Sequence, residues 1–194
     1  MPTTTIKILS IDPGIHHTGW SISSTDATLQ KLTVSTWGEI QASDIAKREF
    51  KSDVKLYGSL ISLFCYEAEI QSLMEKYTPD FVVSEDAFYN PKMPNAFLSL
   101  KLCINAIQRI LFKHHRKLYT IPPTVAKQAV YGKGTANKSA VQESIQILDD
   151  LVIKTTKAHP ISSMVEHEAD SIAIGYAFFK LTLPELVMQQ PLKN

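Results

Sequence analysis

The chain has 194 residues, of which 44% are hydrophobic and 20% charged, with a formal net charge of +1; this is the composition of an ordinary globular protein and predicts one domain over residues 1–194. Its two cysteines, Cys65 and Cys103, fall in apolar helical patterns, which favours buried free thiols and excludes a disulfide framework or a cysteine zinc cluster. The first residues lack a basic stretch followed by an apolar one, and no apolar run is long enough to span a bilayer. We therefore expect a cytoplasmic protein that is not secreted and does not associate with a membrane.

Basic residues are unevenly distributed along the chain. Residues 87–142 contain no Asp or Glu but nine Lys and Arg, while the remainder carries 11 basic and 19 acidic residues. Such segregation favours a surface for a polyanion, with nucleic acid the first candidate, and we expect Lys92, Arg116 and Lys133 to contact it. The alternative is a basic face that is only solvated.

The first predicted strand is the apolar run over residues 6–11, which ends on Asp12 and the turn signal Pro13-Gly14. Residues 19–22 predict a second strand and Leu32–Ile40 a third, which together make an antiparallel meander. An acid at the lip of a sheet lies where the backbone can approach a ligand closely, although Asp-Pro-Gly also occurs as a plain turn cap.

The same pattern recurs at Phe81–Glu85, a second apolar run that ends on an acid. Residues 42–53 predict a loop or the start of a helix, and helical spacing continues from there to Tyr77, before Pro79. A strand, a crossover helix and another strand most economically form a parallel pair, so Phe81–Glu85 is expected beside the first strand. Asp12 and Glu85 would then lie at the same end of neighbouring strands, within reach of one metal ion.

Apolar residues at helical spacing predict a long helix over residues 95–113, whose broad apolar seam could pack in the core or against a partner subunit. The seam consists of Phe97, Leu100, Ile104, Ile107 and Leu111, widened by Cys103, Ala106 and Ile110. The remaining predicted elements are a strand at Leu118–Ile121, a short helix at 124–130, a helix that ends near Leu148, a polar linker at 155–163, a last helix over 165–181 and a frayed tail over about 183–194.

The last predicted helix begins with the run Glu166-His167-Glu168-Ala169-Asp170. Residues three and four apart share one helix face, so Asp170 faces the same way as His167 and Glu166, while Glu168 points elsewhere. A carboxylate in this first turn could join Asp12 and Glu85.

Four blocks of the sequence carry a family resemblance, and their order and spacing agree over about residues 6–179. The blocks are Ile11-Asp12-Pro13-Gly14 with Thr18-Gly19, then Glu85 with Phe88, then Ala126-Lys127-Gln128-Ala129-Val130 with Gly134-Thr135-Ala136-Asn137-Lys138-Ser139, and last Glu168-Ala169-Asp170-Ser171-Ile172-Ala173-Ile174-Gly175. Together they resemble the RuvC-type Holliday junction resolvases of the RNase H-like superfamily. The resemblance implies an α/β fold with a mixed five-stranded sheet, built from an antiparallel meander and parallel strands, with helices on both faces.

Position by position, the resemblance implies a metal site formed by Asp12, Glu85 and Asp170. The family's fourth metal position is usually another aspartate, but in this chain it is His167, a substitution that also occurs in some members. His167 could be a metal ligand, a general base or an orienting group, and Glu166 could supply an oxygen ligand instead. The other histidines are expected to hydrogen-bond locally or to lie on the basic surface: His16, His17, His114, His115 and His159.

The resemblance also places the family's two functional lysines on Lys127 and Lys138 and its base-stacking aromatic residue on Phe88. It implies a homodimer that binds four-way junction DNA and nicks two symmetric strands. Hydrolysis of a phosphodiester needs a water deprotonated near neutral pH and compensation of charge on the leaving oxygen, which two Mg²⁺ ions about 4 Å apart can supply. Lys138 would offset charge that develops on the phosphate. Since imidazole suits Mn²⁺ better than Mg²⁺, Mn²⁺ is expected to substitute.

Three other functions fit parts of the pattern. An Asp-x-Gly turn also opens actin-like ATPases and sugar kinases, but those need two such domains, and an acid-free basic window would be unusual beside ATP, so we expect no nucleotide cofactor. Another RNase H-like nuclease, acting on flaps or RNA/DNA hybrids, would share the fold. A non-catalytic junction-binding protein is less consistent with three acids that would repel one another without a metal.

Overall fold

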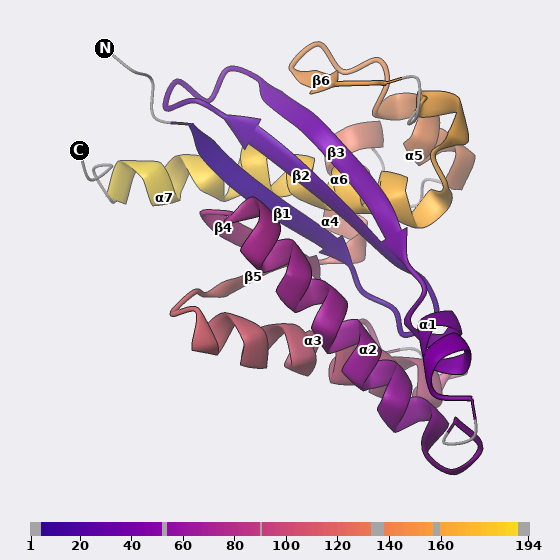
Figure 1. Cartoon of the computed structure of the whole chain (residues 1–194). Coiled ribbons are helices and arrows are strands. Elements are labelled where there is room, and N and C mark those ends of the chain that lie inside the picture. Colours follow the sequence, from indigo (N-terminus) through magenta and orange to yellow (C-terminus); the bar gives the residue numbers. More distant parts are fainter. Residues whose placement is uncertain (1–4, 52–53, 90, 133–137, 157–159, 190–194) are drawn as a thin grey trace.

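A mixed six-stranded sheet runs through the molecule, with helices on both of its faces (Figure 1). The structure, a computed structural model, describes residues 5–51, 54–89, 91–132, 138–156 and 160–189. The strand order is β5-β4-β1-β2-β3-β6. The predicted α/β class, with a meander, parallel strands and helices on both faces, is confirmed, but the expected five strands are one too few.

The centre of the sheet is the predicted meander. Strands β1 (Ile6–Asp12), β2 (Thr18–Thr25) and β3 (Leu32–Ile40) pair antiparallel in chain order. Strand β4 (Phe81–Glu85) lies on the other side of β1 and parallel to it, as the strand–helix–strand pattern predicts. The carboxyl ends of β1 and β4 therefore meet at one edge of the sheet.

Two short strands extend the sheet on either side. Strand β5 (Leu118–Ile121) is parallel to β4, and β6 (Leu151–Ile153) is parallel to β3. The sequence pattern did not predict β6, because an alternation over three residues is too short to be recognised as a strand.

One face of the sheet is covered by α1 (Ala42–Glu49), α2 (Val54–Tyr77) and α3 (Pro94–Lys113). Their apolar residues form one core cluster with the residues of β1 that point to this side. Cys65 and Cys103 lie in that cluster as buried free thiols, as predicted. Most of the apolar seam of α3 is buried in the same cluster, so the seam packs in the core and not against a partner subunit. The buried seam residues are Cys103, Ile104, Ala106, Ile107, Ile110 and Leu111.

The opposite face is covered by α4 (Pro123–Tyr131), α5 (Lys138–Ser144), α6 (Glu166–Leu181) and α7 (Leu183–Gln189), with a short 3₁₀ turn at Ile161–Ser163. Helix α6 is the central element of this layer, because 11 of its 16 residues are buried. It crosses the back of β1, β2 and β3 in Figure 1 and contacts all three strands. The residues at its start are thereby held against the sheet.

The predicted helix end near Leu148 is wrong, and the predicted frayed tail is wrong for residues 183–189. Helix α5 ends at Ser144, and residues 183–189 form α7, in which Leu183 is fully buried. Pro184 lies in the first turn of α7, where its missing N–H does not interrupt a helical hydrogen bond; residues 190–194 lie outside the described part of the chain. Among the described residues no single helix is long and apolar enough to cross a membrane, and only α6 and α7 together, bent by 46°, reach the required length.

Candidate active site

Asp12 and Glu85 lie side by side where two parallel strands end. Ile11 is opposite Ser84 in the β1–β4 ladder, so the next residue on each strand is the acid. Asp12 is 8% exposed, and burial raises the pKa of its carboxyl group. Burial also raises the pKa of Glu85, and the nearby Asp12 and Asp170 carboxylates raise it further, to about 8. The predicted meeting of these two acids at one edge of the sheet is confirmed.

Gly19 allows the first turn of α6 to reach the same edge. A Cβ atom at Gly19 would overlap the backbone carbonyl oxygen of His167 and crowd the backbone N of Glu168. Only a residue without a side chain lets the start of α6 lie directly on β2. Because Gly19 pairs with Asp12 in the β1–β2 ladder, this close approach places the first turn of α6 beside Asp12.

His167 contacts Asp12 directly. Its Nδ1 lies 2.8 Å from Oδ2 of Asp12. An ionised carboxylate can only accept a hydrogen bond, so Nδ1–H donates, and Nε2 is left for a metal ion or a water molecule. The hydrogen bond to Asp12 raises the pKa of His167, and the same bond partly offsets the rise that burial causes in the pKa of Asp12.

Asp170, one turn further along α6, completes the cluster. Burial raises its pKa, and the Asp12 and Glu166 carboxylates raise it further, to about 6. Glu166 therefore lies near the site as well, and the sequence-based alternative between Glu166 and His167 stays open. Glu168 points elsewhere, as predicted, because its Oε2 accepts a hydrogen bond from the backbone N–H of Val165 at the start of the helix.

Lys127 of α4 is the predicted cation that reaches these acids. Its positive charge lowers the pKa values of Asp12, Glu85 and Asp170, although in each case burial is the larger effect. One lysine does not compensate several buried carboxylates, so a large repulsion remains that a divalent cation would relieve.

The carboxylate oxygens of Asp12, Glu85 and Asp170 suit a hard divalent cation, and Nε2 of His167 adds a softer nitrogen donor that Mn²⁺ accepts more readily than Mg²⁺. Within the described ranges, no three His, Cys, Asp or Glu side chains are already placed as a ready set of metal ligands.

The other predicted DNA contacts are dispersed. Phe88 follows Glu85 in an open loop and is 67% exposed, and Lys92, in the same segment, is also exposed. Arg116 lies just before β5, at the opposite end of the sheet, and its guanidinium donates to the backbone oxygen of Asp80; the structure does not bring it to the site. Lys133 lies outside the described residues, and Lys138 begins α5, but its side chain is outside the described set.

Sequence reasoning missed the contact between His17 and His167. The two rings are parallel, with centroids 5.6 Å apart and an angle of 6° between their planes. His17 precedes the Thr18-Gly19 motif, but nothing in the sequence shows that Gly19 brings α6 to this turn. The predicted local bonds of other histidines are confirmed for His16, which contacts Ser43, and for His114, which contacts Gln71.

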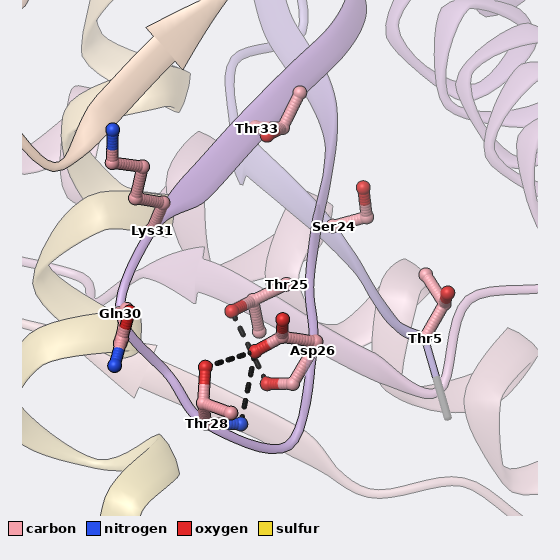
Figure 2. A pocket seen from close by; sticks show the side chains of 8 residues that line it. All are labelled: Thr5, Ser24, Thr25, Asp26, Thr28, Gln30, Lys31 and Thr33. Atoms are coloured by element: carbon pink, nitrogen blue, oxygen red, sulfur yellow. Dashed lines mark hydrogen bonds between the residues drawn. The ribbon is translucent and has the colours of Figure 1, made fainter. Parts of the chain in front are cut away.

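A polar hollow of about 320 Å³ lies at the turn between β2 and β3, lined by hydroxyl groups and by Gln30 and Lys31 (Figure 2). Asp26 accepts hydrogen bonds there from the backbone N–H and the hydroxyl group of Thr28. The hollow is at the far end of β2 from Gly19, and none of the predicted site residues lines it.

Comparison with known proteins gives one consistent family. Residues 8–178 match the family model described as crossover junction endodeoxyribonuclease RuvC. The chain is 30% identical over 145 residues to the protein of that name from Alkaliphilus metalliredigens, which covers 74% of this chain and 79% of the relative. It is 31% identical over 143 residues to the one from Polynucleobacter necessarius, with 74% and 75% covered.

Solved structures agree at the level of the fold. RuvC from T. thermophilus, solved in complex with a Holliday junction substrate, has a TM-score of 0.68 at 21% identity and covers 92% of this chain and 96% of its own. The yeast mitochondrial Holliday junction resolvase has a TM-score of 0.66 at 16% identity, with 90% and 78% covered. A family model that spans most of the chain, together with these relatives and this fold, shows that the protein belongs to the RuvC family of crossover junction endodeoxyribonucleases.

Proposed function

We propose that this protein is a structure-selective endonuclease that resolves four-way DNA junctions by metal-dependent hydrolysis of phosphodiester bonds. The observation that carries the proposal is the cluster of Asp12, Glu85, Asp170 and His167, brought together from two strands and a helix and facing Lys127. Membership of the RuvC family supports the junction as substrate.

Two Mg²⁺ ions are the proposed cofactors, held by the carboxylates of Asp12, Glu85 and Asp170 and by Nε2 of His167. When bound, such ions lower the pKa of a water nucleophile and offset charge on the leaving oxygen. Side chains of the protein would orient the ligands and compensate charge. Asp12 fixes the His167 tautomer, and Lys127 supplies a positive charge next to the phosphate.

We propose that DNA lies over the acid-free segment 87–142, with Phe88 stacked on a base where the junction opens and with Lys92, Lys127, Lys133 and Lys138 on phosphates. The exposure of Phe88, three residues after Glu85, supports this use of its ring. Acting on DNA, the enzyme would work in the cytoplasm or wherever its DNA is.

A homodimer is also proposed, since paired nicks of symmetric strands need two sites. The α3 seam is buried and does not provide the contact surface. A better candidate is the groove of about 550 Å³ between α2 and α3, where Leu98 and Leu102 are exposed. Leu60 and Phe64 of α2 are exposed as well.

The decisive experiment is the Asp12→Asn variant on a labelled synthetic four-way junction. Removing a buried carboxylate from the cluster is expected to abolish cleavage in both Mg²⁺ and Mn²⁺, while binding to the junction is retained. Persistent cleavage would refute the metal assignment. Flap and RNA/DNA hybrid substrates run alongside test the alternative RNase H-like activities, and equal cutting of all substrates would favour a general nuclease. A wild-type protein that binds junctions but cuts nothing would be a junction-binding protein only.

A further inference from the structure

The imidazole of His167 is restrained from two directions. Its Nδ1 donates to Oδ2 of Asp12, 2.8 Å away. His17 lies parallel to the ring, with centroids 5.6 Å apart, which is the offset stacked arrangement that aromatic rings favour. The hydrogen bond fixes the position of Nδ1, and the parallel His17 ring adds a second restraint, which acts on the plane of the His167 ring.

His17 is itself fixed. Its Nδ1 lies 2.9 Å from Oε1 of Glu39, and Oε2 of Glu39 accepts a hydrogen bond from Nε2 of Gln41 at 2.5 Å. The turn that carries His17 is closed by Thr18, whose hydroxyl oxygen accepts the backbone N–H of Gly14 at 3.1 Å and whose hydroxyl group donates to the carbonyl oxygen of Gly14. The His17 side chain is 52% exposed, and its bond to Glu39 ties the ring to the neighbouring strand β3.

The space around His167 makes this restraint necessary. His167 and His17 both line a cavity of about 470 Å³, whose other wall includes Asn95, Ala96 and Ser99 at the start of α3. No side chain of the described residues fills that volume, so an unrestrained His167 ring could swing into it and turn Nε2 away from the acids. The His17 ring lines this space beside the His167 ring.

We propose that His17, oriented by Glu39, is a positioning residue that sets the ring plane of His167 and so aims Nε2 at the carboxylate cluster. The proposal rests on the proposed function in one respect, namely that Nε2 serves the metal site. The line from Gln41 through Glu39, His17 and His167 to Asp12 then joins β3 to β1 through side chains.

The test compares His17→Ala, which removes the ring, with His17→Phe, which keeps a flat ring but cannot bond to Glu39. Glu39→Gln keeps a polar partner without its charge, and His16→Ala is the matched control, since His16 is in the same turn but bonds to Ser43. The first readout is imidazole NMR of the metal-free protein. We expect cross-relaxation between the His17 and His167 rings in wild type, displaced His167 resonances in His17→Ala, a smaller displacement in His17→Phe and Glu39→Gln, and none in His16→Ala.

The second readout is kinetic. Single-turnover junction cleavage is expected to fall about tenfold in His17→Ala and less in His17→Phe, with Mn²⁺ affinity reduced in the same order, while the junction dissociation constant stays at the wild-type value. Unchanged His167 resonances in His17→Ala would overturn the proposal. A dissociation constant that rises as much as the rate falls would also overturn it, because His17 would then be a DNA contact.

An equal loss of rate in His16→Ala would overturn the proposal too, since the effect would belong to the turn and not to the stacked ring. Failure of the proposed function would give a different result from failure of the His17 proposal. In that case wild type itself leaves junctions uncut in Mg²⁺ and Mn²⁺, whereas the metal-free spectra still decide whether His17 orients His167.

Discussion

Burial and mutual repulsion act on the same three carboxylates at the edge of the sheet. The fold holds Asp12, Glu85 and Asp170 together, although Asp12 raises the pKa values of both Glu85 and Asp170, and Asp170 raises that of Glu85 as well. Such an arrangement costs stability unless a cation compensates the charge, and the cost is visible in the pKa of Glu85, about 8. The acid types and their positions at strand and helix ends could be predicted from the sequence. The strength of the repulsion between these carboxylates could not be predicted from the sequence, because it depends on their burial and on the distances between side chains of β1, β4 and α6.

Stability of the metal-free protein should therefore depend on Glu85. Between pH 4.5 and about 8 the folded protein keeps a proton on this side chain that the unfolded chain releases, so the free energy of unfolding falls as pH rises through this range and levels off above it. Glu85→Gln is expected to lose most of this slope and to be about 1–3 kcal/mol more stable than wild type at pH 8, while losing activity. Urea unfolding in a chelator at pH 5 and pH 8 measures both. A wild-type stability that rises over this range would contradict the shift.

His167 should determine the metal preference. Because imidazole nitrogen is a softer ligand than carboxylate, Mn²⁺ is expected to support cleavage at least as well as Mg²⁺ in wild type. His167→Asp replaces the ring by a hard oxygen donor and is expected to raise the ratio of the Mg²⁺ rate to the Mn²⁺ rate roughly tenfold. Complete inactivity of wild type in Mn²⁺ would argue against ligation through Nε2.

At the scale of the elements, the strands that carry the acids were the easiest part to predict. β1 and β4 are apolar runs that end on an acid, and the long helix between them required a parallel pair. The prediction was wrong where local pattern was short or where tertiary contacts decided the outcome, as in β6 and in α7, which Leu183 anchors in the core. The site follows the same rule, since the contact of Gly19 with α6 and the stacked His17 ring depend on how the elements pack.

We expect Gly19 to be essential for the close packing of α6 on β2. Gly19→Ala places a Cβ atom against backbone atoms of His167 and Glu168, which cannot move aside as a side chain would. We expect a loss of about 1–3 kcal/mol in stability and a larger loss of cleavage, because the first turn of α6 must shift away from Asp12.

Gly132→Ala is the control for this substitution. Gly132 ends α4 with a φ of +77°, and among the described residues nothing lies within 4 Å of the position that a Cβ atom would take there. This change should cost about 1 kcal/mol, because alanine is strained at positive φ, and should leave the site intact. Denaturant unfolding and single-turnover cleavage separate the two variants.

At the scale of the whole molecule, the acids of the site and the leucines of the proposed dimer contact lie on different elements. The site is formed at the ends of β1 and β4 and the start of α6, whereas Leu98 and Leu102 line the groove between α2 and α3. The groove and the cavity beside His167 share Ile15, His16, Asn95 and Ser99, whereas Leu98 and Leu102 line the groove alone, so substitutions at these two leucines separate association from chemistry.

Leu98→Glu tests the proposed dimer. A charge in an apolar contact must be desolvated without a partner, so we expect a monomer in light scattering that still folds, binds a junction more weakly and makes unpaired nicks. Phe112→Glu is the control, because Phe112 is on the same helix but is 82% exposed and does not line the groove. A Leu98→Glu protein that keeps the wild-type mass would place the contact elsewhere.

Helix α6 supplies both the middle of one hydrophobic layer and two groups of the site, His167 and Asp170. Enzymes that carry their reactive groups on open loops can lose activity by local melting while the rest of the molecule stays intact. Local melting of this kind is not expected here, because the turn that carries His167 packs directly on Gly19. Separating the two would pull α6, the most buried helix of its layer, out of the core. On heating, inactivation and global unfolding should thus share one midpoint, so that residual cutting after a heat pulse reports the surviving fraction of folded molecules.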